Sequence, residues 1–107
     1  FSVETLQTVP QIDFIAMGEG ELTIADLIQG LKDGLTNFAA IPGLVSRAAD
    51  GKVVMGPHRD LIPSLDQLPM PAYDLFPMEK YVGHTYWKPF AELLTSRGCP
   101  LTPLIWL

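Results

Sequence analysis

The spacing of the prolines limits what this 107-residue chain can fold into. Five of its ten prolines fall in the 21 residues between Pro57 and Pro77. Proline fixes φ and lacks a backbone N–H, so no helix or strand of ordinary length fits there. We predict an extended interdomain linker, partly polyproline II in character. Its many apolar side chains predict that it lies on a protein surface: Leu61, Ile62, Leu65, Leu68, Met70, Tyr73, Leu75 and Phe76.

A strand, a glycine turn and a helix are predicted before the linker. The apolar run of residues 12–17 is typical of a strand buried on both faces, as in parallel sheets, although a buried helix segment is the alternative. After the turn, one apolar stripe recurs at helical spacing and predicts a helix to about Gly34. Its members are Ile24, Leu27, Ile28 and Leu31. With a short helix before Pro10, this order predicts an α/β doubly wound fold.

Two further elements complete the predicted structure. Residues 43–47 and 52–55 are prone to form strands, and Asp50-Gly51 between them is a strong hairpin signal. Residues 91–96 predict a strand that runs into the turn Arg97-Gly98-Cys99-Pro100.

Composition excludes several classes of function. The net charge is −5, and residues 1–34 carry this excess while residues 35–107 balance, so no basic stripe is present to grip nucleic acid. No apolar run approaches the ~20 residues of a membrane span, and no secretory signal pattern is present, so we expect a cytoplasmic chain. The single cysteine excludes a disulfide framework within the chain. His58 and His84 lie far apart and show no metal-ligand spacing.

Two places are candidates for chemistry. The turn Gly18-Glu19-Gly20-Glu21 follows a predicted strand, where open α/β sheets bind ligands, although a plain strand-to-helix turn that binds nothing gives the same pattern. Its two glutamates argue against a phosphate ligand. Cys99 lies in a predicted turn, a position typical of functional residues, whereas most lone cysteines are inert apolar residues.

The chain resembles the family of B12-dependent radical SAM proteins in three places. The run Asp13-Phe-Ile-Ala-Met-Gly-Glu-Gly-Glu21 resembles the last strand and turn of the family's cobalamin-binding domain. Residues 68–77, Leu-Pro-Met-Pro-Ala-Tyr-Asp-Leu-Phe-Pro, look like the linker between its two domains. Residues 95–100, Thr-Ser-Arg-Gly-Cys-Pro, are similar to the opening of its radical SAM core. The three pieces occur in the family's order and cover most of the chain.

The resemblance implies a cofactor for each candidate site. Gly18, Glu19, Gly20 and Glu21 would lie near cobalamin in a Rossmann-like domain. Cys99 would be the first of three thiolates, spaced C-x3-C-x2-C, that hold a [4Fe–4S] cluster in a partial (β/α) barrel. The open iron of that cluster binds S-adenosylmethionine in the family. Its reductive cleavage yields a radical or supports methyl transfer.

The end of the chain departs from this family pattern. The second and third cysteines would fall at Pro103 and Trp106, neither of which can ligate iron. We therefore expect that the chain is a fragment of a longer enzyme, inactive alone, that binds none of these cofactors stably. It is expected to fold loosely or to self-associate.

The resemblance divides the chain into three predicted parts. Residues 1–40 would end the cobalamin-binding domain, residues 41–90 would form the hairpin and linker, and residues 91–107 would begin the barrel with its first strand. The alternative is a small stand-alone, non-catalytic module that binds a protein through its apolar linker.

Overall fold

The computed structural model describes residues 1–82, 90–94 and 96–97. The chain divides after Ile62 into two compact units, residues 1–62 and 63–107, and each is described by itself. The predicted domain boundaries at residues 40 and 90 stay a prediction.

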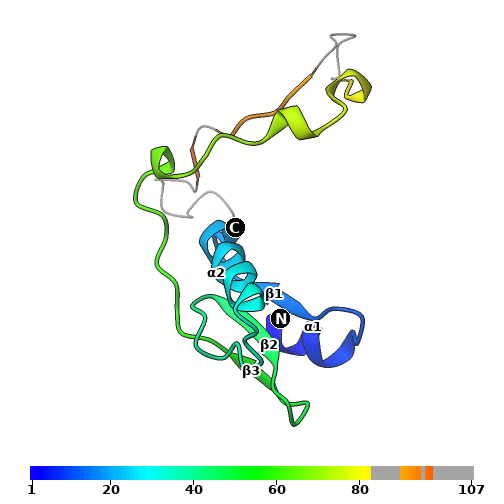
Figure 1. Cartoon of the computed structure of the whole chain (residues 1–107), viewed down its shortest axis with the longest axis vertical. Helices are drawn as coiled ribbons and strands as arrows, with labels where there is room; N and C mark the ends of the chain where they lie inside the picture. Colours follow the sequence, from blue (N-terminus) through cyan, green and yellow to red (C-terminus); the bar gives the residue numbers. More distant parts are fainter. Residues whose placement is uncertain (83–89, 95, 98–107) are drawn as a thin grey trace, which may run out of the picture. The chain divides into compact units, whose positions relative to one another are not determined.

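The first unit is a small mixed helix and sheet structure (Figure 1). In chain order it contains α1 (Ser2–Thr8), β1 (Phe14–Ala16), α2 (Gly20–Lys32), β2 (Leu44–Arg47) and β3 (Val53–Met55). The strands form one antiparallel sheet in the order β1-β2-β3. α1 contacts all three strands, and α2 contacts β1. The predicted order of helix, strand, turn, helix and hairpin is confirmed.

The strand β1 forms as predicted, but the predicted direction of its neighbour and its predicted burial were wrong. A strand buried on both faces of a parallel sheet was expected, but β1 pairs antiparallel with β2, and its residues are only half-buried. In the described part of the chain β2 is its one strand neighbour, so β1 is an edge strand. The strand that is deeply buried is the central strand β2, in which Leu44 and Val45 are almost fully buried. The ring of Phe38 packs edge-on against Phe14, with centroids 5.1 Å apart.

The hairpin between β2 and β3 forms as predicted. Gly51 has φ +82°, the left-handed conformation that glycine adopts without strain. The Asp50 carboxylate accepts a hydrogen bond from the Lys52 backbone N–H at 3.0 Å and lies 3.0 Å from the Lys52 ammonium. These contacts with Lys52 lower the pKa of the Asp50 carboxyl group below its usual value.

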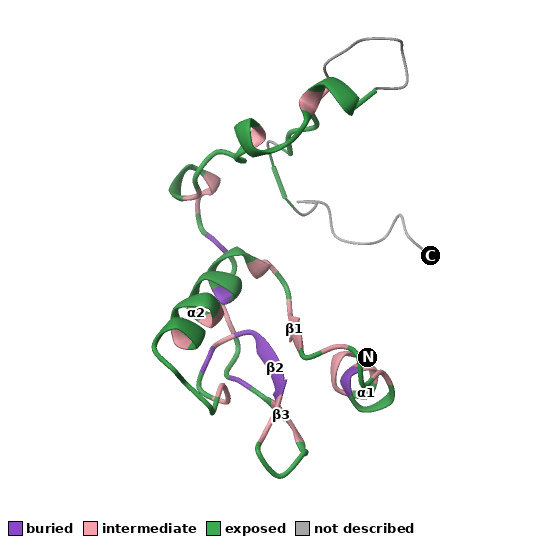
Figure 2. Ribbon diagram, turned by 45° about the vertical axis from the view of Figure 1, so that its right-hand side comes forward, coloured by how far each residue is buried: buried purple, intermediate pink, exposed green. Residues whose placement is uncertain are grey.

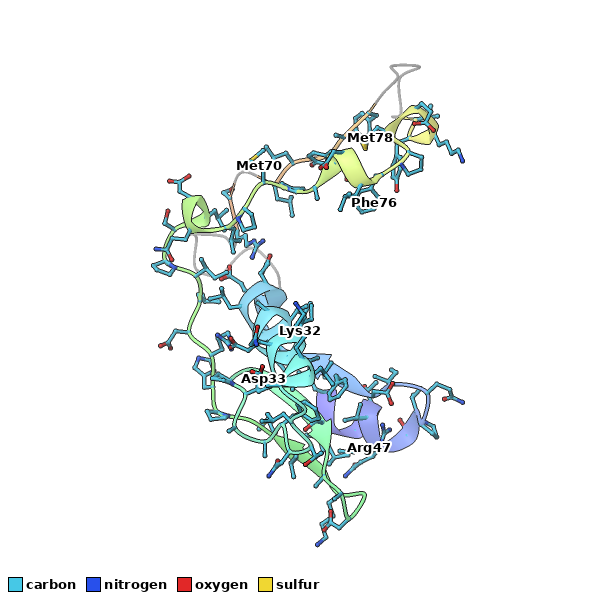
Figure 3. All side chains as sticks on the ribbon, in the orientation of Figure 1. Lys32, Asp33, Arg47, Met70, Phe76 and Met78 are labelled. Carbon is cyan, nitrogen blue, oxygen red and sulfur yellow. The ribbon has the colours of Figure 1, made fainter. Side chains whose placement is uncertain are left out.

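The Arg47 side chain connects α1 to the sheet by hydrogen bonds. The guanidinium of Arg47, at the end of β2, donates hydrogen bonds to the carbonyl oxygens of Leu6, Val9 and Ile12 (Figure 3). Two of these carbonyls belong to the last turn of α1 and its C-cap, where helix carbonyls lack partners within the helix. Leu6, the one buried residue of α1, belongs to the core of the first unit; Figure 2 colours all buried residues purple. The buried apolar residues of this core are Leu6, Ile41, Leu44, Val45 and Ile62.

The apolar stripe predicted for α2 faces partly outward. Ile24, Ile28 and Leu31 are 50%, 47% and 51% exposed, whereas Thr23 is fully buried and its hydroxyl donates to the Pro42 carbonyl at 3.1 Å. The helix is as long as predicted, but three short strands are too small a surface to cover the whole stripe.

The second unit contains single turns of 3-10 helix. These are Leu65–Gln67, Tyr73–Leu75 and Met78–Lys80, each set off by extended residues. The barrel strand predicted at residues 91–96 is absent from its described part, residues 91–94 and 96. A strand requires a hydrogen-bonded neighbour, and the described residues do not supply one.

A buried hydroxyl in β2 leads to a stability prediction. Ser46 is 1% exposed, and its Oγ has no hydrogen-bond partner among the described residues. Burial of an unpaired hydroxyl is unfavourable, so we expect Ser46→Ala to raise the free energy of unfolding by about 1 kcal/mol. Urea unfolding followed by circular dichroism measures this change.

The matched control for Ser46 is a buried hydroxyl that is bonded. Thr23→Val keeps the side-chain shape but removes the bond to Pro42, so it should lower the free energy of unfolding by about 1 kcal/mol. If Ser46→Ala destabilised the chain as much as Thr23→Val does, the Ser46 hydroxyl would be bonded after all.

Candidate functional site

The glycine turn lies between β1 and α2, as the sequence predicted. The Met17 N–H donates to the Gly43 carbonyl at 2.8 Å, which fixes the chain as it leaves β1. Gly18 has φ +68°, so its backbone requires glycine, and the space where a side chain would project is open. A side chain at Gly20 would make only ordinary contacts, 3.5 Å from the Ala16 Cβ. The turn therefore presents open backbone on the side of Gly18.

The two glutamates of the turn differ in position. Glu19 is the N-cap residue of α2, but its side chain makes no capping hydrogen bond; its carboxylate instead accepts the Ile62 N–H at 2.5 Å. Glu21 is exposed in the first turn of α2, where the helix dipole favours an acid. The four residues predicted as a site thus lie in one turn, with Glu19 directed to the segment after β3.

The segment after β3 also contacts α2 through Arg59, which the sequence did not predict. The guanidinium of Arg59 pairs with Asp26 of α2, and its Nε donates to the Pro42 carbonyl at 3.1 Å. The Arg59 side chain is only 16% exposed. A lone arginine in a proline-rich stretch is ordinarily solvated, so the sequence holds no local signal for this contact.

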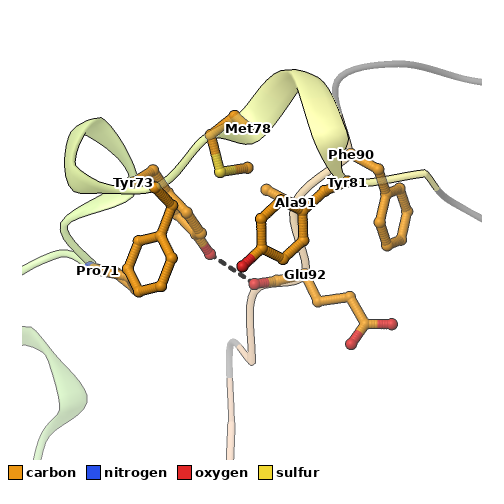
Figure 4. A pocket seen from close by; sticks show the side chains of 8 residues that line it. Pro71, Tyr73, Met78, Tyr81, Phe90, Ala91 and Glu92 are labelled. Atoms are coloured by element: carbon orange, nitrogen blue, oxygen red, sulfur yellow. Dashed lines mark hydrogen bonds between the residues drawn. The ribbon is translucent and has the colours of Figure 1, made fainter.

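The second unit contains an apolar cavity of about 330 Å³ (Figure 4). The Tyr73 hydroxyl donates to the Glu92 carbonyl at 2.5 Å and joins the two segments that form it. The rings of Phe76 and Tyr81 meet edge to face, 6.4 Å apart. The lining consists of Pro71, Tyr73, Phe76, Met78, Tyr81, Phe90, Ala91 and Glu92. Its lining suits an apolar group, and among the described residues no set of polar groups converges on it that would define a reaction.

The predicted cluster ligand, Cys99, lies outside the residues that the structure describes, as do His84, Pro103 and Trp106. Across residues 1–82, 90–94 and 96–97, no group of three or more histidine, cysteine, aspartate or glutamate side chains could hold a metal ion. The same residues include no helix long and apolar enough to cross a membrane.

The chain is similar in sequence to curated proteins, among them two methyltransferases and a cyclase. The chain is 44% identical over 96 residues to an uncharacterized methyltransferase of Pyrococcus horikoshii, covering 90% of this chain and 20% of that protein. It is 33% identical over 101 residues to an anaerobic magnesium-protoporphyrin IX monomethyl ester cyclase of Rubrivivax gelatinosus, covering 92% and 18%. It is 31% identical over 117 residues to a cytidylyl-2-hydroxyethylphosphonate methyltransferase of Streptomyces wedmorensis, covering 84% and 22%.

The chain spans about a fifth of the length of these curated relatives. No family model and no solved structure matches it.

Proposed function

Because this chain belongs to the family of B12-binding radical SAM proteins, we propose that it is a segment of a cobalamin-dependent radical SAM enzyme. The observation that carries the proposal is its similarity, over most of its length, to two methyltransferases and a cyclase. The stand-alone interaction module, the rival hypothesis, gives no reason for this similarity. The substrate is not assigned, because the relatives named act on different molecules.

We propose the glycine turn as the cobalamin contact of this segment. The open space beside Gly18 supports this role, because a large ligand can approach the backbone there. The N-terminus of α2 adds backbone N–H groups that the Glu19 side chain does not cap. Cobalamin would supply the methyl-transfer or electron-transfer chemistry; the turn would hold it and keep it oriented.

The exposed surfaces of the first unit support a larger α/β domain around it. Ile24, Ile28 and Leu31 form a half-exposed apolar stripe, and β1 has one edge without a strand neighbour in the described residues. Parallel strands added at the free edge of β1 would extend the sheet into a Rossmann-like domain, with β2 and β3 as its antiparallel edge, and would place more surface under α2. In this chain alone, we expect the stripe to promote self-association.

We assign Cys99 as a candidate ligand of the [4Fe–4S] cluster that binds S-adenosylmethionine. The assignment comes from the sequence pattern, and the chain supplies one thiolate of the three that the family uses. Thiolates are suitable ligands for such a cluster because they are soft and anionic.

The cobalamin proposal is tested in a chimera. The segment of the Pyrococcus horikoshii protein that aligns with this chain is exchanged for residues 1–97, and the product is titrated with hydroxocobalamin. We expect micromolar or tighter binding, and a loss of about tenfold or more in Gly18→Asn, because asparagine tolerates the positive φ of this position while its side chain would fill the open space beside the backbone. The isolated chain should bind far more weakly, since one turn is a small part of a cobalamin site.

The matched control is Ala25→Asn, which places the same side chain at an exposed position within α2. It should leave the affinity unchanged. Equal affinity of the Gly18→Asn chimera and the unmodified chimera would remove the turn from the cobalamin site. A chimera that folds but does not bind would contradict the proposed function itself.

A further inference from the structure

Residues 57–62 lie along the first unit rather than extending away from it. The Pro57 carbonyl accepts the Gly43 N–H at 2.8 Å, so the segment is fixed at its start. In its middle, Arg59 pairs with Asp26 of α2 and donates to the Pro42 carbonyl. At its end, the Ile62 N–H is bound by Glu19, and the Ile62 side chain is 8% exposed. Each third of this short segment therefore has its own contact with the first unit.

From these contacts we propose that residues 57–62 form a strap, and that Glu19 and Asp26 are the two carboxylates that latch it. Glu19 is the N-cap residue of α2 and Asp26 lies at the middle of this helix, and both carboxylates reach backbone or side-chain donors of the strap. Hydrogen bonds to charged groups are among the stronger ones in proteins, and a half-buried pair is screened less than a surface pair. The latch thus holds the strap against the glycine turn and α2 as far as Ile62, the last residue of the first unit.

The latch changes the role of Glu19. As a cofactor contact its carboxylate would face the ligand, but here it is committed to the Ile62 N–H. Glu19 is therefore a positioning residue, and the open side of the turn, at Gly18, remains for a ligand. This last assignment rests on the proposed function, whereas the latch itself does not involve cobalamin.

Trypsin measures the latch directly, because Arg59 is itself a cleavage site. The protease must extract the Arg59 side chain from Asp26 and Pro42 and extend the backbone around it. We expect Glu19→Ala and Asp26→Ala to speed cleavage after Arg59 by about tenfold, as the strap opens locally without unfolding the unit. Lys52, 81% exposed at the hairpin, is an internal reference: cleavage after it should stay constant. Mass spectrometry of the early fragments separates the two sites.

Two variants control for charge and shape. Glu19→Gln keeps a side-chain oxygen that accepts the Ile62 N–H, so cleavage after Arg59 should stay near the unmodified rate. Asp33→Ala removes a carboxylate from the other end of α2, where it is bonded to Gln29, and should have no effect.

Two outcomes would overturn the latch. One is an unchanged rate after Arg59 in both alanine variants. The other is an equal rise after Lys52 and Arg59, because the carboxylates would then stabilise the whole unit rather than the strap. Since no cofactor is present, the result is independent of whether the chimera binds cobalamin.

Discussion

Replacement of Gly56 by alanine should unfold the first unit. A Cβ at this buried position would lie 2.0 Å from the Ile41 carbonyl oxygen and 3.0 Å from its carbon. The Gly56 N–H is also bonded to the Leu44 carbonyl at 2.8 Å, so the backbone cannot move away without breaking the sheet edge. We expect a loss of about 3 kcal/mol or more, a large part of the stability of a domain this small. Circular dichroism of the helices during urea unfolding measures it.

The control for Gly56 is the hairpin glycine. Gly51→Ala meets no atom within 4 Å, but it places alanine at φ +82° and should cost about 1 kcal/mol. The order of the two variants is the decisive result. A Gly56→Ala chain as stable as Gly51→Ala would show that β3 and the loop before β2 lie further apart than in the structure.

The second large effect is expected at Arg47. Arg47→Ala would leave the carbonyl oxygens of Leu6, Val9 and Ile12 without their shared donor. The Val9 carbonyl would keep its second donor, the Ile12 N–H at 3.2 Å. Loss of the charged hydrogen bonds at the partly buried Leu6 and Ile12 carbonyls is unfavourable, so we expect a loss of about 3 kcal/mol. Because these carbonyls hold α1, amide exchange in residues 2–8 should rise more than exchange in β2. Hydrogen–deuterium exchange with mass spectrometry resolves the two segments.

Two further variants serve as comparisons for the stability loss in Arg47→Ala. Arg47→Lys keeps the charge, but a single ammonium cannot span three carbonyls as the guanidinium fork does, so stability should be intermediate. Lys52→Ala removes an exposed cation on the hairpin and should change stability by less than about 1 kcal/mol. If Arg47→Ala affected α1 no more than Lys52→Ala does, the guanidinium would not cap this helix.

Local signals in the sequence predicted the elements of the first unit well. The helix after the glycine turn and the hairpin at Asp50-Gly51 depend on neighbouring residues, through helical spacing and glycine conformation. The direction of the strand next to β1 was not predictable in this way. Strand pairing is a contact between distant segments, and the same apolar run can join a parallel or an antiparallel neighbour.

The position of the candidate site in the chain was predictable from the sequence, but its contacts with distant segments were not. The sequence located the turn of residues 18–21, and the positive φ of Gly18 agrees with a glycine requirement there. It did not predict that Glu19 binds Ile62 or that Arg59 binds Asp26, because each pair is separated by more than 30 residues. Likewise, nothing near Gly56 in the sequence indicates the close approach of Ile41.

The hairpin has a consequence for how chains of this kind can vary in length. Its tip, residues 48–51, is closed by local hydrogen bonds such as that from the Gly51 N–H to the Ala48 carbonyl at 2.9 Å. Extra residues there would lengthen a surface loop at a small entropic cost and would leave the pairing of β2 with β3 in place. Between residues 41 and 43 an insertion would displace Gly43, whose carbonyl and N–H hold Met17 and Pro57. The tip is thus the position at which a reporter peptide can be inserted while the strap and the glycine turn keep their places.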